Sequence, residues 1–368
     1  MKPMKEGLDR AAIQRMANNL AQVFNELNVD TFVDEACSQI EALELKQRVD
    51  FLIERLQTHL EGTFPEIAKR LVQLPPVWDR GDENDALRGF AAWPVIDYVA
   101  VAGLDHPDIA LDVLEKLTSL FSAEFAVRPF IQKHPELTNA KLQDWSEHED
   151  LHVRRLASEG CRPRLPWGIR LNEFINDPAP VLAVLERLNN DPDLYVRRSV
   201  ANNLNDISKD HPDLVIQTCQ RWLELNQGAE TAWIVKQALR TLVKQGHPDV
   251  FALLGYSANH QVQAQLSLNQ KELSIGESLP FTVLLETEQD EQSVVVDYVV
   301  HHQKANGKTA PKVFKLKSVT LNSGNPQRIE KSHSFKPVTT RKYYPGEHIL
   351  AVQINGVEVG REVFWLRG

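Results

Sequence analysis

The residues best suited to chemistry lie in one stretch, residues 158–167 (SEGCRPRLPW), which combines a carboxylate, two guanidinium groups, a thiol and an indole. A related pattern of paired arginines, YVRRSVANNLND, follows at residues 195–206 and ends in a carboxylate. Arginines recognise phosphate oxygens, and a carboxylate placed among them can stabilise a developing positive charge. The two segments therefore predict a site that binds a polyanion and also carries out a reaction.

The first segment continues from a predicted helix over residues 152–160, whose apolar residues recur at helical spacing. This helix places Arg155 and Glu159 four residues apart, which taken alone describes an ordinary surface ion pair. Residues 162–167 are too short and too rich in proline to continue the helix. We expect a loop mounted on the helices, where functional side chains concentrate. The side chains that it would project are Arg162, Arg164 and Trp167, of which Trp167 is either a ligand contact or an apolar plug between repeats.

The second segment predicts a helix with a row of hydrogen-bond donors. Arg198, Asn202, Asn205 and Lys209 recur at i, i+4, i+7 and i+11 and suit phosphate oxygens. Asp206 falls on the neighbouring row. Its alternative role is an ion pair with Lys209 or Arg198.

Two further reactive side chains have simpler explanations. Glu124 lies before a predicted helix start, where a negative charge is stabilising, so the sequence gives it little functional weight. Cys161 is more readily a small buried thiol than a nucleophile. The cysteines are far apart, with no metal-ligand spacing, which favours a reduced cytoplasmic protein without zinc.

The first two thirds of the chain predict helical repeats. His-Pro-Asp occurs at 106–108, 211–213 and 247–249, and proline followed by an acid suits the first turn of a helix. Val153, Val196 and Val235 align at a period near 40, which is typical of HEAT-like repeats. Such repeats leave an extended concave surface.

The composition changes near residues 256–262, after which short alternating apolar runs are separated by turn residues. About seven strands in this region predict a β-sandwich of the immunoglobulin-like type. Asn355-Gly356 between two alternating runs predicts a hairpin. We therefore expect two domains, an all-α solenoid over 1–258 and an all-β domain over 262–368.

Charge is distributed unevenly along the chain. The net charge is −9, yet residues 304–342 hold ten basic residues and one acid, Glu330. Local asymmetry decides how a protein meets a charged partner. We expect Lys312, Lys315 and Lys317 to make a second contact with nucleic acid. No nucleotide-binding, zinc-protease or serine-hydrolase motif occurs, and no apolar run of 18 residues suggests a membrane span.

The segment SEGCRPRLPW, with HVRRLA before it and DPDLYVRRSVANNLNDISKDHPD after it, resembles the AlkC-type DNA alkylation-repair glycosylases. This group belongs to the HEAT-like-repeat superfamily that also contains AlkD. The resemblance extends over residues 8–255 and is most specific over 150–215. The appended immunoglobulin-like domain matches a known AlkC subtype.

The resemblance implies base excision repair by hydrolysis of the N-glycosidic bond of cationic N3-methylated bases, without base flipping and without a cofactor. Such a base leaves readily, so the barrier is positive charge on the sugar, which a carboxylate stabilises. The implied partner is double-stranded DNA and the implied state a cytoplasmic monomer. Carried onto this chain, the catalytic candidates are Glu159 and Asp206, then Glu124. The DNA-binding candidates are Arg155, Arg162, Arg164, Trp167, Arg197, Arg198 and Lys209, together with the three lysines of the β domain. The alternatives are a noncatalytic HEAT-repeat adaptor and a damaged-DNA-binding protein without turnover.

Overall fold

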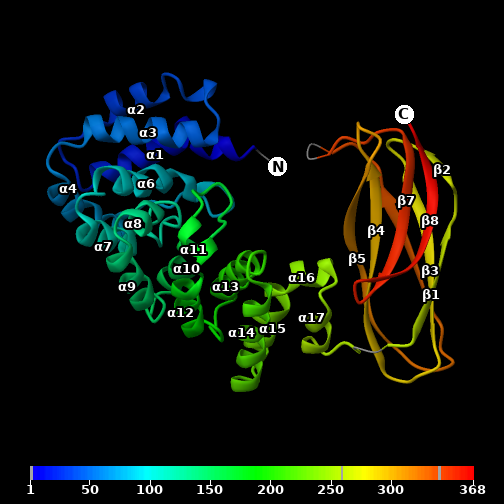
Figure 1. Cartoon of the computed structure of the whole chain (residues 1–368). Helices are drawn as coiled ribbons and strands as arrows, with labels where there is room; N and C mark the ends of the chain where they lie inside the picture. Colours follow the sequence, from blue (N-terminus) through cyan, green and yellow to red (C-terminus); the bar gives the residue numbers. More distant parts are fainter. Residues whose placement is uncertain (1–2, 258–259, 339–340) are drawn as a thin grey trace. The chain divides into compact units, whose positions relative to one another are not determined.

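The computed structural model describes residues 3–257, 260–338 and 341–368. It divides into two compact units, Met1–His211 with Trp222–Ala238 and Pro212–Arg221 with Leu239–Gly368. A helical repeat region is followed by a β-rich domain, which confirms the predicted fold class (Figure 1). The domain boundaries stay a prediction, because the last two helices group with the strands.

The described part of the chain before residue 256 forms seventeen α-helices. No described helix is long and apolar enough to cross a membrane. The helices are α1 (Arg10–Ala21), α2 (Val29–Cys37), α3 (Leu45–His59), α4 (Phe64–Leu71), α5 (Leu74–Val77), α6 (Trp93–Ala102), α7 (Pro107–Leu117), α8 (Arg128–Lys133), α9 (Pro135–Trp145), α10 (Leu151–Gly160), α11 (Asn172–Asn176), α12 (Ala179–Arg187), α13 (Leu194–Ile207), α14 (Pro212–Leu225), α15 (Ala229–Ala238), α16 (Arg240–Gln245) and α17 (Pro248–Leu253). Short 3₁₀ helices lie at Met4–Leu8, Ile40–Ala42 and Arg88–Ala92.

The histidine-proline pairs mark helix starts, as the sequence predicts. Helices α7, α9, α14 and α17 each begin at the proline of such a pair. A proline at the first helical position leaves no additional amide unpaired, because that amide has no partner within the helix. His134 and His211 also donate from Nε2 to the carbonyls of Leu104 and Ile175, at 2.8 and 2.7 Å. The motif therefore joins the start of one helix to an earlier part of the chain.

The repeat alignment is visible in the core. Val153, Val196 and Val235 lie on α10, α13 and α15, and each is 2% exposed or less. Helix α10 packs against α13, and α13 packs against α15. The equivalent valines therefore form the apolar seam of successive repeats, as their spacing predicts.

The β-rich unit contains two sheets. One has the order β1-β3-β6 and the other the order β2-β8-β7-β4-β5; every pair is antiparallel except β2 with β8. Its core is formed by residues from both sheets, among them Phe281, Val296, Phe335 and Phe364. The strands are β1 (Val262–Leu268), β2 (Glu272–Ser274), β3 (Ser278–Thr287), β4 (Gln292–Gln303), β5 (Thr309–Leu321), β6 (Gln327–Ser334), β7 (Gly346–Ile354) and β8 (Val357–Arg367).

The predicted hairpin at Asn355-Gly356 is confirmed. It joins β7 to β8 directly, with Ile354 paired to Val357. Both turn residues have positive φ, 47° and 78°, which is the conformation of the tight two-residue turn that asparagine and glycine favour. The described residues form eight strands rather than about seven. The three-residue β2 is too short to give an alternating pattern.

Three buried histidines lie in the aromatic core of the β-rich unit. His302, His333 and His348 pack around Phe335, with His302 ring centroids about 6 Å from the other two. Each has one ring nitrogen that is buried without a hydrogen-bond partner among the described residues. Burial lowers the pKa of His302 to about 3 and of His333 to about 4, with Arg341 adding to both shifts, and it also lowers the pKa of His348. These histidines are neutral in the folded protein at neutral pH.

We expect the free energy of unfolding of this unit to fall as the pH drops below about 6.5. In this pH range the three histidines bind protons in the unfolded chain but stay neutral in the folded protein, so protonation favours unfolding. Buried Asp297, whose pKa burial raises to about 6, opposes this trend, because it binds a proton in the folded state first. Three histidines outweigh one carboxyl, so stability should rise with pH between 4 and 6.5.

Urea unfolding of the full chain across this pH range measures the slope. His333→Phe should flatten it and Asp297→Asn should steepen it. A slope that neither substitution changes would contradict the assignment.

Candidate functional site

The predicted carboxylates and arginines meet in one continuous row of alternating charge. Arg155 bonds Glu124 through Nη1 and lies 3.6 Å from Glu159 through Nη2. Arg162 donates from Nη1 to Glu159 Oε1 at 2.6 Å and from Nε to Asp206 Oδ2 at 2.8 Å. The row ends where Lys209 donates to Asp206 Oδ1 at 2.8 Å.

Three separate elements of the helical unit contribute to this row. Glu124 precedes α8, Arg155 and Glu159 lie on α10, and Asp206 lies near the end of α13. Arg162 follows α10 and links the two helices. Its side chain is turned into the protein, with the residue only 8% exposed, so the expectation that it projects from the loop is wrong.

Burial makes the charges in this row dependent on one another. Glu159 is 5% exposed and Asp206 is 2% exposed, and an unpaired charge at such depth costs several kcal/mol. Burial opposes the charged form of both arginines. The adjacent carboxylates outweigh it and raise the pKa of Arg155 and of Arg162. Each ion in the row therefore requires its neighbours.

The carboxylates differ in the oxygens that they leave open. Both oxygens of Asp206 accept hydrogen bonds from cations. Glu124 accepts its bonds from Ser122 and Arg155 at Oε2, and Glu159 accepts at Oε1. Oε1 of Glu124 and Oε2 of Glu159 have no hydrogen-bond partner among the described residues. These two oxygens are the ones available to a substrate or a water.

Glu124 also borders a hollow of about 350 Å³. Phe121, His152, Arg155 and Tyr195 line it as well. The Arg155 guanidinium lies 4.8 Å from the centroid of the Tyr195 ring, an attractive cation–π arrangement that holds the arginine in the row. The importance of Glu124 could not be predicted from local sequence, because its partner Arg155 lies 31 residues away along the chain.

The loop that carries Trp167 is held rigidly. Arg128 is fully buried and donates to the carbonyl of Gly160 at 2.8 Å and to that of Ile169. Trp167 has a φ of 65°, which is uncommon for a residue other than glycine, and it is 65% exposed. Trp167 is therefore a presented side chain, and the alternative of a buried apolar plug is wrong.

The paired arginines of the two repeats divide into two roles. The first of each pair, Arg154 or Arg197, donates to backbone carbonyls five and six residues earlier. Arg197 is half-buried and uses Nη1 for these bonds, and its role as a phosphate contact stays a prediction. The second arginine of the first pair, Arg155, lies in the charged row, and the second arginine of the other pair, Arg198, is exposed.

Arg164, in the loop after α10, is partly exposed and forms an ion pair with Asp210 at 2.9 Å.

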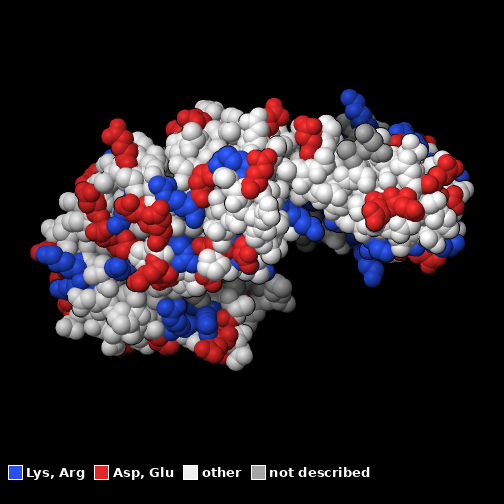
Figure 2. Space-filling view, turned by 90° about the horizontal axis from the view of Figure 1, so that it is seen from below, with Lys and Arg blue, Asp and Glu red and all other residues white. Residues whose placement is uncertain are grey.

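The predicted row of donors on α13 is only partly at the surface. Arg198 and Lys209 are exposed, whereas Asn205 is 5% exposed. Figure 2 shows basic and acidic side chains interspersed over one face of the helical region.

Cys161 is buried, and this burial raises the pKa of its thiol to about 12, which agrees with a structural role.

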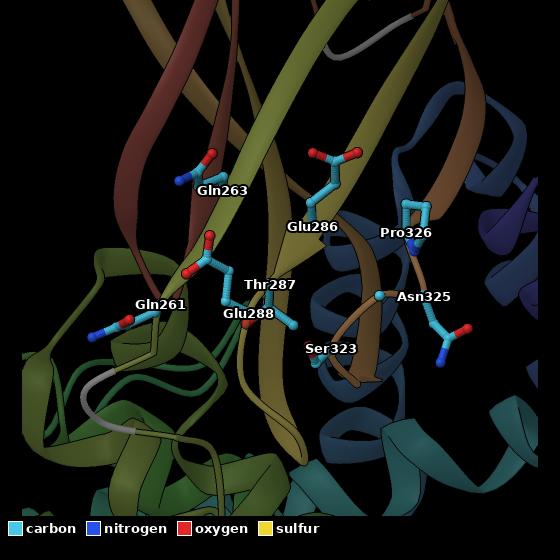
Figure 3. A pocket seen from close by; sticks show the side chains of 9 residues that line it. Gln261, Gln263, Glu286, Thr287, Glu288, Ser323, Asn325 and Pro326 are labelled. Carbon is cyan, nitrogen blue, oxygen red and sulfur yellow. The ribbon is translucent and has the colours of Figure 1, made fainter.

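The three lysines of the β-rich unit lie on β5, an edge strand. All are exposed, but they do not share one face. In the register of β4 and β5, Lys315 lies opposite Asp297 and Lys312 lies opposite Val300, which faces the core. A β-bulge between Lys315 and Lys317 interrupts this register, so these two lysines do not share a face either. A separate hollow in this unit has a volume of about 380 Å³. Glu286 and Glu288 are among the side chains that border it (Figure 3). None of the described residues that line it is a lysine or arginine, so it does not suit phosphate.

We expect Arg162→Ala to lower the free energy of unfolding by about 3–5 kcal/mol, because it leaves two buried carboxylates without their shared partner. Urea unfolding of the full chain measures this. Arg164→Ala is the matched control, since its more exposed pair with Asp210 should contribute less than about 1 kcal/mol. Equal losses in the two variants would show that the row is not a coupled unit.

Comparison with known proteins extends these findings. Residues 121–242 match the family model for the DNA alkylation repair enzyme, and residues 262–368 match the C-terminal Ig-like domain of YhaZ. The uncharacterised protein YhaZ of Bacillus subtilis is 38% identical over 358 residues, 97% of each chain. The alkylpurine DNA glycosylase AlkC of Pseudomonas fluorescens, solved with DNA containing an abasic site analogue, is 36% identical over 100% of both chains, with a TM-score of 0.91. The chain therefore belongs to the AlkC-type family of DNA alkylation repair enzymes, as a member with a C-terminal immunoglobulin-like domain.

Proposed function

We propose that this protein is a monofunctional DNA glycosylase that releases cationic N3-methylated bases, 3-methyladenine and 3-methylcytosine, from double-stranded DNA. The observation that carries the proposal is the charged row, in which Glu124 and Glu159 each keep one carboxylate oxygen open. The similarity to an alkylpurine DNA glycosylase over the full chain supports the same reaction.

The reaction needs few parts. The bond between the sugar carbon and the glycosidic nitrogen breaks, and its electron pair neutralises the positive charge of the leaving base. The sugar becomes an oxocarbenium ion, which a carboxylate stabilises. Water then adds to the sugar carbon and gives a proton to a carboxylate. No step requires a metal or an oxidant.

The geometry ranks the three carboxylates for this task. Glu124 is the most accessible of them, with a side chain that is 15% exposed, and it borders the hollow next to Tyr195. Glu159 is second, because its open oxygen lies in a more buried place. Asp206 has both oxygens bound to cations, so its role is to hold Arg162 in place. If Lys209 moves to a phosphate of the DNA, Oδ1 of Asp206 also becomes available.

The cations divide in a corresponding way. Arg155 and Arg162 hold carboxylates in the charged row, so we assign them to positioning rather than to phosphates. Arg198, Arg164 and Lys209 are exposed or partly exposed and are the phosphate contacts of this unit. Trp167 packs against the sugar or the opened stack. We propose that the base stays in the duplex during the reaction.

Single-turnover release of free base from N3-methyladenine duplex DNA tests the proposal. We expect release by the unmodified protein and a drop of about 10²–10³-fold for Glu124→Gln or Glu159→Gln, the size of a lost electrostatic contact to the transition state. Asp112→Asn is the control, because this carboxylate also pairs with a cation, Lys141, but lies outside the row. No release by the unmodified protein, or undiminished release by the double glutamine variant, would refute the proposal.

The lysines of β5 provide a separate test of the predicted second DNA contact. Neutralising Lys312, Lys315 and Lys317 to glutamine should weaken DNA binding and reduce the log–log salt slope by roughly 0.9 for each lost phosphate contact. Lys271→Gln is the control, since Lys271 lies in the same unit and already pairs with Glu362. An unchanged slope with increased aggregation would show instead that these lysines protect an edge strand.

A further inference from the structure

A second hollow, of about 200 Å³, lies beside the Trp167 loop and outside the charged row. Helix α3 contributes Lys46 and Asp50 to its lining, helix α6 contributes Asp97 and Val101, and Phe125 and Trp167 are also part of its wall. All these residues belong to the helical unit. The reaction proposed above does not use Asp97, Asp50 or Lys46.

Asp97 is the unusual member of this lining. It is 6% exposed, and its Oδ2 accepts from the indole N–H of Trp93 at 2.9 Å and from the Lys46 ammonium at 3.4 Å. Its Oδ1 is buried and has no hydrogen-bond partner among the described residues. Burial raises the pKa of Asp97 to about 6. A buried carboxylate with an unfilled accepting position is costly unless a donor fills it.

The remaining walls are largely apolar. Val101, Trp167 and Ile169 are 52%, 65% and 47% exposed, an unusual grouping of large apolar side chains at the surface. Phe125 stacks on Trp93 with ring centroids 5.3 Å apart, and this stack fixes its orientation. Aromatic surfaces of this kind bind planar rings.

One wall of the hollow is fixed before any ligand arrives. Buried Arg128 holds the carbonyl of Ile169, and Trp167 keeps its left-handed backbone at the rim. Uncommon backbone conformations of this type collect at ligand-binding positions because the surrounding structure must enforce them. A preformed wall reduces the entropy lost on binding.

Charge decides which planar ring fits. Asp50 and Asp97 both approach Lys46, at 3.8 and 3.4 Å, so the hollow holds two carboxylates against one ammonium. This excess of negative charge disfavours a phosphate and favours a donor or a cation. An amino-bearing nucleobase meets these conditions, since its ring stacks on Phe125 or Trp167 and its amino group donates to Asp97.

We propose that this hollow is a base-binding subsite for an N-methylated, amino-bearing nucleobase, with Asp97 as the acceptor of its exocyclic amino group. The inference rests on the proposed function, because base release supplies this ligand beside the charged row. The same chemistry has two sources: the base freed by hydrolysis, or the base still attached to DNA.

Equilibrium dialysis of the full-length protein against free 3-methyladenine tests the first source. We expect saturable binding that Asp97→Asn weakens about tenfold or more, the effect of losing a hydrogen bond to a charged group. Ala100→Leu, which fills the hollow from α6, should abolish binding by a different route. Hypoxanthine, which has a carbonyl in place of the amino group, should bind about tenfold more weakly than adenine. The control is Asp105→Asn, whose carboxylate pairs with Lys133 outside the hollow.

Duplex DNA tests the second source. In a Glu124→Gln background, affinity is compared between a duplex with N3-methyladenine and one with an abasic site analogue, with and without Asp97→Asn. If Asp97→Asn weakens binding of the methylated duplex but not of the abasic duplex, the base still attached to DNA occupies the hollow. That result would support the subsite and would overturn only the proposal that the base is not flipped.

If free base does not bind and Asp97→Asn affects neither duplex, the subsite proposal is overturned, whatever the rate of base release. If the unmodified protein releases no base, the proposed function fails. The dialysis result still decides whether the hollow binds a base.

Discussion

The helical unit depends on one buried contact, the bridge that Arg162 forms between Glu159 and Asp206. A charge at this depth is tolerated only if its partners are in place, so the end of α10 and the end of α13 must meet in one relative position. Arg162 fixes that position because one planar group donates to both carboxylates. The row extends from this bridge to Arg155 and Glu124 on one side and to Lys209 on the other.

The same contact explains why paired arginines recur without repeating one function. In each repeat the first arginine closes the backbone turn before its helix, a purely structural task. The second arginine is free to face the surface, and the carboxylates beside it decide its role. Arg155 forms ion pairs with Glu124 and Glu159 and is part of the charged row, whereas Arg198 is exposed. A repeated sequence thereby supplies both a positioned carboxylate and a cation for a polyanion.

Local patterns predicted the elements well, because helix starts, apolar seams and tight turns are set by near neighbours in the chain. Pro107, Val196 and Asn355 all behave as their sequence contexts indicate. Side-chain direction was not predictable where it depends on a distant partner. Arg162 turns inward because Asp206, 44 residues later, lies there, and Asp97 becomes notable only when Lys46 and Trp167 reach the same hollow. The bulge opposite Asp297 likewise separates lysines that look equivalent in the sequence.

The charged row also limits the substrates that this surface accepts. Its cations occupy most of the carboxylate oxygens, so only two oxygens, one on Glu124 and one on Glu159, are left to face a substrate. With so few open acceptors, the site suits a leaving group that needs no protonation. A base made cationic by methylation meets that requirement, since breaking its glycosidic bond removes its charge. The electrostatic support can then be directed entirely at the sugar, where positive charge develops as the bond breaks.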